Sequence, residues 1–140
     1  PDQVQIFEPI LGDSADHVTT GLLTATHYLK DNRILPTGFD KQTAPPEIAV
    51  VGAALADPDF TAGSATTHYA IPASAAQGPF RVAVELVYQP IGFRWAHNLS
   101  PYQAAEPQKF VGYYTQAAAQ SALVLAHADS TAPATAAAGN

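Results

Sequence analysis

The chain has 140 residues, enough for one domain with a single core, and 47% of them are hydrophobic. Six Lys and Arg residues against twelve Asp and Glu residues give a net charge of −6, which disfavours nucleic acid as a partner because phosphate binding requires clustered basic side chains. The sequence contains no Cys, which excludes disulfides, thiolate metal sites, thiol catalysis and covalent haem attachment within this chain.

The apolar runs and the N-terminal residues were compared with the patterns of membrane-spanning helices and secretory signals. The longest apolar run, residues 48–56, is much shorter than the ~20 residues of a membrane-spanning helix, so we expect no span. No basic segment followed by an apolar stretch precedes the first strand-like residues. We therefore expect a secretory signal to be absent or already removed, with position 1 a processing or fragment boundary.

Gly and Pro residues interrupt the chain at short intervals up to about position 107, which favours short strands joined by turns. Segments 4–10, 19–29, 47–51 and 66–71 are rich in β-branched, aromatic or Thr residues and are predicted to be strands. The sequence Gly12-Asp13-Ser14 is expected to turn the chain after the first of them.

The clearest strand is predicted over 80–89, where large apolar residues alternate with a second, mixed set. A strand with one buried and one mixed face is typical of an antiparallel sheet. The period changes after Pro107, and apolar residues spaced three and four apart in an Ala-rich stretch predict one helix over about 108–127. Residues 128–140 lack periodicity and are predicted to form a flexible tail.

These elements predict an all-β fold, an antiparallel β-sandwich of about six to eight strands with one C-terminal helix, in a domain covering 1–127. No complete set of nucleophile, base and orienting group can be named, so we expect a noncatalytic protein. Gly12-Asp13-Ser14 matches the opening letters of one esterase class, but the remaining blocks of that pattern are missing from the sequence.

Two carboxylates stand close together in a turn-rich loop. Asp57 and Asp59 could supply hard oxygen ligands to Ca²⁺, although the loop does not follow the EF-hand pattern, because Ala62 and His68 stand where that pattern requires Gly and Glu. An Asp-rich surface turn is the alternative interpretation. The five His residues show no helical pair with zinc-protease spacing.

The densest cluster of large and functional side chains is Phe93-Arg94-Trp95-Ala96-His97-Asn98. Trp and Arg are typical anchors of protein interfaces, so we predict Arg94, Trp95 and His97 as contact residues. Pro90 is expected to end strand pairing and to direct this segment to a sheet edge or end. The alternative is that Trp95 lies in the core and Arg94 pairs with a carboxylate.

Several segments resemble a known family. Four segments carry the resemblance and occur in a fixed order. They are Tyr28-Leu29-Lys30-Asp31-Asn32-Arg33-Ile34-Leu35-Pro36-Thr37-Gly38-Phe39-Asp40-Lys41, the Ala56–Phe60 loop, the segment from Glu85 to Leu99, and Phe110-Val111-Gly112-Tyr113-Tyr114. Over roughly residues 5–126, the chain resembles the C-terminal haem-free region of bacterial multihaem c-type cytochromes.

The resemblance implies a β-sandwich attached to haem-bearing sequence and exported to the periplasm or the cell surface. It implies a noncatalytic accessory domain that contacts a multihaem cytochrome or its haem-bearing domain, with electron transfer carried out by haem c outside this chain. No Cys-x-x-Cys-His motif occurs here, so this chain departs from the cytochrome itself and holds no haem c of its own.

A second class of function stays open, namely an extracellular carbohydrate- or ligand-binding or structural β-sandwich module. An exposed row of aromatic side chains would favour it, and the sequence supplies Tyr28, Tyr69, Tyr88, Trp95, Tyr102, Tyr113 and Tyr114. The edges of sandwich sheets can also pair between copies, so a homo-oligomer or a filament is a further possibility.

Overall fold

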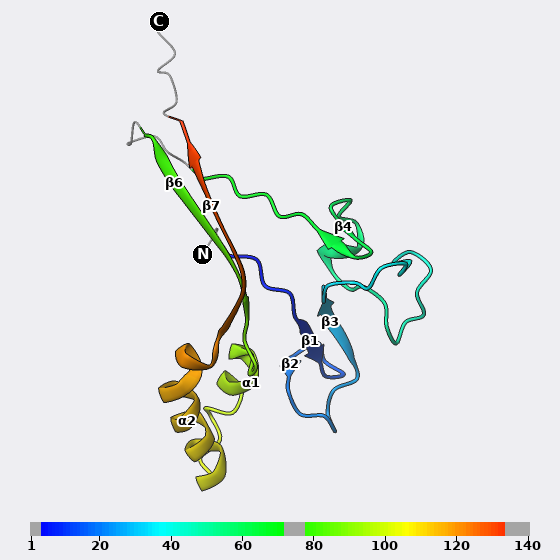
Figure 1. Cartoon of the computed structure of the whole chain (residues 1–140). Coiled ribbons are helices and arrows are strands. Elements are labelled where there is room, and N and C mark those ends of the chain that lie inside the picture. The colour runs from blue at the N-terminus through cyan, green and yellow to red at the C-terminus, as the bar shows by residue number, and fades with distance from the viewer. Residues whose placement is uncertain (1–3, 72–77, 134–140) are drawn as a thin grey trace, which may run out of the picture. The chain divides into compact units, whose positions relative to one another are not determined.

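The computed structural model describes residues 4–71 and 78–133 (Figure 1). Contacts within the chain group it into two compact units, Pro1–Ile71 and Pro72–Asn140, where the sequence predicted one domain over 1–127. Each unit is described by itself. Among the described residues, no helix combines the length and the apolar character needed to cross a membrane.

The first unit contains two small antiparallel sheets. Strands β1 (Pro9–Gly12), β2 (Val18–Thr19) and β3 (His27–Asp31) form a sheet in the order β2-β1-β3, with a register shift in β1 between Ile10 and Leu11. Strands β4 (Phe60–Thr61) and β5 (Ser64–Ala65) form a two-stranded sheet, preceded by a 3₁₀ helix, η1 (Ala53–Leu55).

The strand predicted over 19–29 is wrong, because a turn separates β2 from β3. The backbone N–H groups of Thr24 and Ala25 both donate to the carbonyl of Gly21 at 2.9 Å. The Thr24 hydroxyl donates to the same carbonyl, and the Thr19 hydroxyl accepts from the N–H of Gly21. Thr side chains that bond to nearby backbone compete with the sheet ladder in this way.

The strands predicted over 4–10, 47–51 and 66–71 are also largely wrong. The first is reduced to the short β1, and the last has no strand within the described residues. From the segment 47–51, only Val51 pairs, in an isolated antiparallel bridge in which its N–H and carbonyl bond to Asp31 at 3.0 and 2.9 Å. Pairing stops there because Gly52 follows with a φ of +89°.

The core of the first unit is small. Leu35, Val50 and Phe60 are buried together, and Phe7 stacks on Phe60 with ring centroids 6.4 Å apart. The buried Asn32 beside them is satisfied, since its side chain accepts from the N–H of Glu8 and donates to the carbonyl of Ile6.

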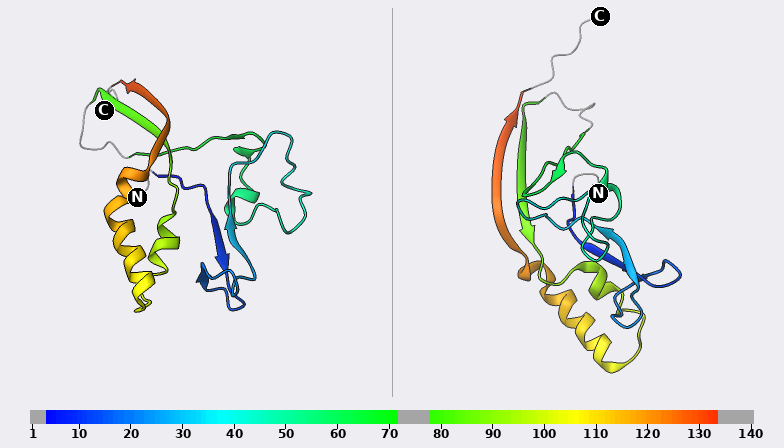
Figure 2. Two further views of the ribbon diagram at one scale, coloured as in Figure 1. Left: turned by 60° about the horizontal axis from the view of Figure 1, so that its bottom comes forward. Right: turned by 90° about the vertical axis from the view of Figure 1, so that its right-hand side faces the viewer.

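The second unit is a long ribbon joined to two helices (Figure 2). Strand β6 (Phe80–Tyr88) confirms the strand predicted over 80–89 and pairs along its whole length with β7 (Leu123–Ala132). The register runs from Phe80 opposite Ala132 to Tyr88 opposite Leu123, with a shift after Leu86. Helices α1 (Phe93–His97) and α2 (Ala105–Ser121) lie between the two strands in the chain.

The helix predicted over 108–127 is wrong at its C-terminal end. Helix α2 stops at Ser121, Ala122 is extended, and the next ten residues form β7. The predicted tail over 128–140 therefore starts with strand residues, and its last seven positions lie outside the described residues. High Ala content favours a helix, but pairing with β6 overrides this propensity.

The antiparallel, β-rich character of the fold is confirmed by three small antiparallel sheets. The α-helical part is larger than predicted, because α1 was not expected. The packing of two sheets face to face, which would make a sandwich, stays a prediction.

Candidate functional site

Helix α1 contains all three predicted contact residues. It begins after Gly92, whose backbone is extended, four residues beyond the end of β6. These five residues form a helical turn and not a strand, and their predicted position at a sheet edge or end stays a prediction. The single buried residue of this helix is Ala96, at 1% exposure.

The remaining side chains of α1 face outward. Trp95 is 40% exposed and Phe93 is 66% exposed, so the interpretation of Trp95 as a core residue is wrong. The ring of Phe93 stacks on His97 at a centroid distance of 5.2 Å and an angle of 13°. Arg94 and His97 place basic groups in the last turn of the helix. The turn thus combines exposed aromatic rings with basic groups, the combination typical of interface anchors.

Polar contacts fasten α2 to the end of β6 and to the loop that follows α1. The side-chain amide of Gln89, just after β6, donates to the carbonyl of Ala118 and to the hydroxyl of Ser121, both at 3.2 Å. The amide of Gln108 donates to the carbonyls of Ser100 and Tyr102 and so holds the loop between the two helices. These bonds hold the two segments that flank α1, residues 89 and 100–102, to α2.

The aromatic residues considered for ligand binding are only partly exposed. Tyr28 and Tyr114 are half-buried, and the exposed ones belong to different elements and loops of both units: Tyr69, Tyr88, Trp95, Tyr102 and Tyr113. They do not share one sheet face, which is what a carbohydrate-binding row would require.

The loop that carries Asp57 and Asp59 is organised by a lysine. The ammonium of Lys41 donates to the carbonyls of Ala54, Asp57 and Phe60 at 3.1, 2.5 and 2.7 Å. It therefore occupies the centre of three carbonyl oxygens, the kind of ligand that Ca²⁺ also selects. Nothing in the local sequence around Lys41 indicated this role.

The two Asp carboxylates have protein partners. Asp57 Oδ1 accepts from the N–H of Asp59 at 2.9 Å, and Asp59 Oδ2 lies 3.1 Å from His68 Nε2. Within residues 4–71 and 78–133, no group of three or more His, Asp or Glu side chains could hold a metal ion. The Ca²⁺ site at Asp57 and Asp59 stays a prediction.

An open groove of about 790 Å³ runs beside this loop in the first unit. Its apolar lining includes Phe7 and Phe60, and its polar lining includes Lys30, Asn32 and the pair of Asp59 and His68. The participation of His68 was missed by sequence reasoning, because His68 and Asp59 are nine residues apart and are joined by the β4–β5 hairpin.

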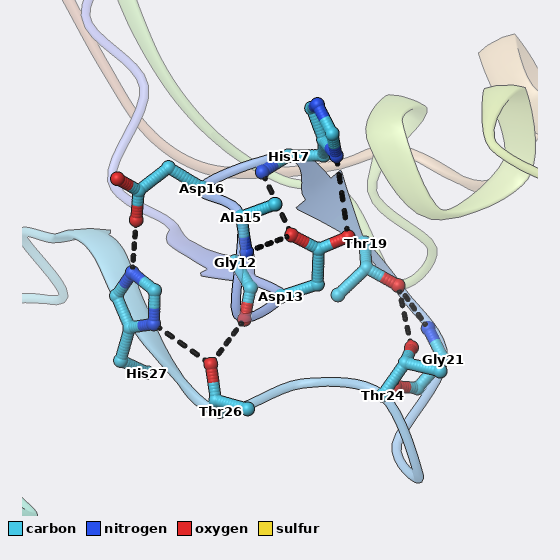
Figure 3. Close-up of polar contacts among 10 residues, drawn as sticks. All are labelled: Gly12, Asp13, Ala15, Asp16, His17, Thr19, Gly21, Thr24, Thr26 and His27. Atoms are coloured by element: carbon cyan, nitrogen blue, oxygen red, sulfur yellow. Dashed lines mark hydrogen bonds and ion pairs between the residues drawn. The ribbon is translucent and has the colours of Figure 1, made fainter.

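The Gly12-Asp13-Ser14 segment is a structural turn (Figure 3). The carboxylate of Asp13 accepts from the N–H groups of Ala15 and His17 at 2.8 and 3.0 Å, and these bonds lower the pKa of Asp13. Asp16, which has a φ of +62°, contacts His27 at 2.9 Å across the sheet. This network ties the β1–β2 turn to β3.

Comparisons with protein-family models, with curated proteins and with solved structures found no match to this chain.

Proposed function

We propose that this chain is a noncatalytic interaction domain that joins a multihaem c-type cytochrome, or its haem-bearing domain, in an electron-transfer assembly outside the cytoplasm. The partner is proposed from the sequence segments described above, and the contact surface is helix α1 with Arg94, Trp95 and His97. We further propose that the antiparallel strands of this chain form a β-sandwich, the fold that the resemblance implies.

The observation that carries the proposal is the balance between buried and exposed apolar side chains. Among the described residues, 23 large hydrophobic side chains are exposed, whereas four hydrophobic residues are buried. A stable isolated domain of this length is expected to bury a much larger share of its apolar groups. Exposed apolar surface on this scale is typical of a chain that is covered by a partner.

Helix α1 is the best candidate for the central contact. Its aromatic groups offer a large contact area, and Arg94 and His97 supply basic groups on a chain with a net charge of −6. A partner surface that carries carboxylates, such as exposed haem propionates, would complement these groups.

The polar groups support a noncatalytic role. Asp13 closes a turn, Asp16 contacts His27, Asp57 caps a backbone N–H, and Asp59 contacts His68. Each carboxylate serves local structure, and no nucleophile stands beside a base and an orienting group in these contacts.

Trp95 makes the proposal testable because it is the only Trp in the chain. Haem quenches Trp fluorescence by energy transfer, so titration with a purified multihaem c-type cytochrome is expected to quench the emission of Trp95 saturably. The double variant Arg94→Ala/His97→Ala keeps the reporter and is expected to bind at least about tenfold more weakly, because two contact side chains are lost.

Lys109→Ala is the matched control, because Lys109 is exposed on α2, where its ammonium lies over the ring of Tyr113. It is expected to bind as the wild-type chain does. Linear, unsaturable quenching, or equal losses for the control and the α1 variant, would overturn the proposal. Circular dichroism melting curves check that each variant is folded.

A further inference from the structure

We propose that strand β6 is a self-association edge, at which two copies of this chain pair antiparallel with Ala83 on the two-fold axis. Paired in this way, β6 and β7 of both copies form one four-stranded antiparallel sheet. This inference does not depend on a cytochrome partner and concerns a different surface from α1.

The ribbon has an open edge and exposed apolar side chains. Within residues 78–133, β6 pairs with β7 alone, and Val82, Val84 and Leu86 are all exposed. A two-stranded ribbon by itself is marginally stable in water, and a third or fourth strand is normally needed. A nine-residue strand with an unpaired edge is also a template for pairing with another strand.

The sequence of β6 selects a second copy as the occupant of this edge. Residues 80–86 read Phe-Arg-Val-Ala-Val-Glu-Leu, which is symmetric in character about Ala83. Antiparallel pairing about this residue places Val82 opposite Val84 of the second copy and Phe80 opposite its Leu86. The smallest side chain of the segment then lies on the axis, where the two copies meet.

The charges agree with the same register. Pairing about Ala83 places Arg81 opposite Glu85 of the second copy, and the symmetry of the pair repeats this contact. In the structure, Arg81 contacts Asp129 at 3.0 Å and Glu85 lies 3.7 Å from His127, yet the side chains of Arg81 and Glu85 are still 78% and 54% exposed. Across the four strands, the row therefore reads Thr131, Arg81, then Glu85 and His127 of the second copy, with Asp129 reaching Arg81 from the neighbouring row.

Other registers do not bring apolar side chains and opposite charges together in this way. A parallel pair in register places Arg81 of one copy beside Arg81 of the other, and the two like charges repel each other. Antiparallel registers centred one residue away, on Val82 or Val84, place Arg81 opposite Ala83 or Val87. Registers centred between residues place the apolar face of one copy beside the mixed face of the other, because side chains alternate with a period of two.

A single cysteine on the axis tests the proposal directly, because the wild-type chain has no Cys. In the full-length Ala83→Cys variant, two thiols face each other across directly opposed residues, whose Cα atoms are about 4.5–5.5 Å apart in an antiparallel pair. That spacing allows a disulfide. We expect a disulfide-linked dimer of twice 14.6 kDa after mild oxidation.

The matched control is Ala128→Cys, an exposed Ala on β7 that lies opposite Val84 at the outer edge of the ribbon. It is expected to cross-link about tenfold more slowly, because its thiols are not held together by pairing. Equal rates for the two variants, or faster cross-linking of Ala128→Cys, would overturn the proposal.

The register has its own test. Mixing Val82→Cys chains with Val84→Cys chains of different mass is expected to give mainly the mixed disulfide, whereas a statistical mixture of products would contradict pairing about Ala83. Light scattering on the wild-type chain is expected to show a mass that rises from 14.6 kDa towards twice that value with concentration. A mass fixed at 14.6 kDa would contradict the proposal whatever the outcome with a cytochrome.

Discussion

The ammonium of Lys41 contacts both the backbone carbonyl and the aromatic ring of Phe60. The ammonium donates to the carbonyl of Phe60 at 2.7 Å and lies 5.8 Å from the centroid of its ring, while Phe60 itself is 3% exposed. The same ammonium binds the carbonyls of Ala54 and Asp57, so one side chain holds η1, the Asp57 loop and the start of β4 together.

Replacement of this lysine tests its structural role. Lys41→Met retains most of the aliphatic stem but leaves three carbonyls without their donor, so we expect the free energy of unfolding to fall by about 2 kcal/mol. Chemical denaturation followed by far-ultraviolet circular dichroism measures the change. Lys109→Met on α2 is the control and is expected to change stability by less than about 0.5 kcal/mol. Equal effects would show that Lys41 does not organise the loop.

The small core of the first unit makes Phe60 its most sensitive position. Phe60→Ala removes the ring that stacks on Phe7, and we expect a loss of about 3–5 kcal/mol, enough to unfold a unit with so few buried side chains. The matched control is Phe93→Ala, since Phe93 is exposed on α1. Loss of the dispersed amide NMR signals of residues 4–71 in the first variant only is the expected result.

The Asp13 turn predicts how acid affects the first unit. Hydrogen bonds from Ala15 and His17 lower the pKa of Asp13 below its ordinary value of 3.8, so the folded state binds its proton less readily than the unfolded chain does. The stability from this group is complete above about pH 4 and is lost as the pH falls through the lowered pKa. Asp13→Asn is expected to reduce the fall in stability between pH 5 and pH 2, as measured by urea denaturation midpoints across that range. An unchanged slope would contradict the assignment.

Trp95 separates an interface role from a core role. Its side chain is exposed on α1, whereas Ala96 anchors that helix, so Trp95→Ala is expected to change stability by less than about 1 kcal/mol. Loss of a central aromatic anchor is expected to weaken cytochrome binding by about 2 kcal/mol, or roughly thirtyfold, in isothermal titration calorimetry. A large fall in melting temperature would contradict the exposed position of Trp95 on α1.

The sequence predicts best where one local pattern decides the structure. Strand β6 was predicted almost to the residue because its alternation extends over nine positions. Its partner β7 was assigned to helix and tail, because Ala-rich residues favour a helix and the pairing with β6 is a contact between distant segments. A five-residue helix such as α1 is too short for its period to be recognised.

In the candidate site, too, the residues that are neighbours in sequence could be predicted and the long-range contacts could not. Arg94, Trp95 and His97 were found as a cluster because they are neighbours in sequence, and the structure places them on one helical turn. Lys41 could not be found, because its three carbonyl partners lie 13 to 19 residues away and the side-chain type alone does not indicate them.

The measurement that tests the central claim most directly is the visible absorption spectrum of the native preparation, recorded with the intact mass of the polypeptide that carries this sequence. An interaction domain of a cytochrome assembly predicts a haem Soret band that co-elutes with the chain on size exclusion, either in a complex or in a polypeptide heavier than 14.6 kDa. A colourless 14.6 kDa species that elutes apart from every haem-containing fraction would contradict the account.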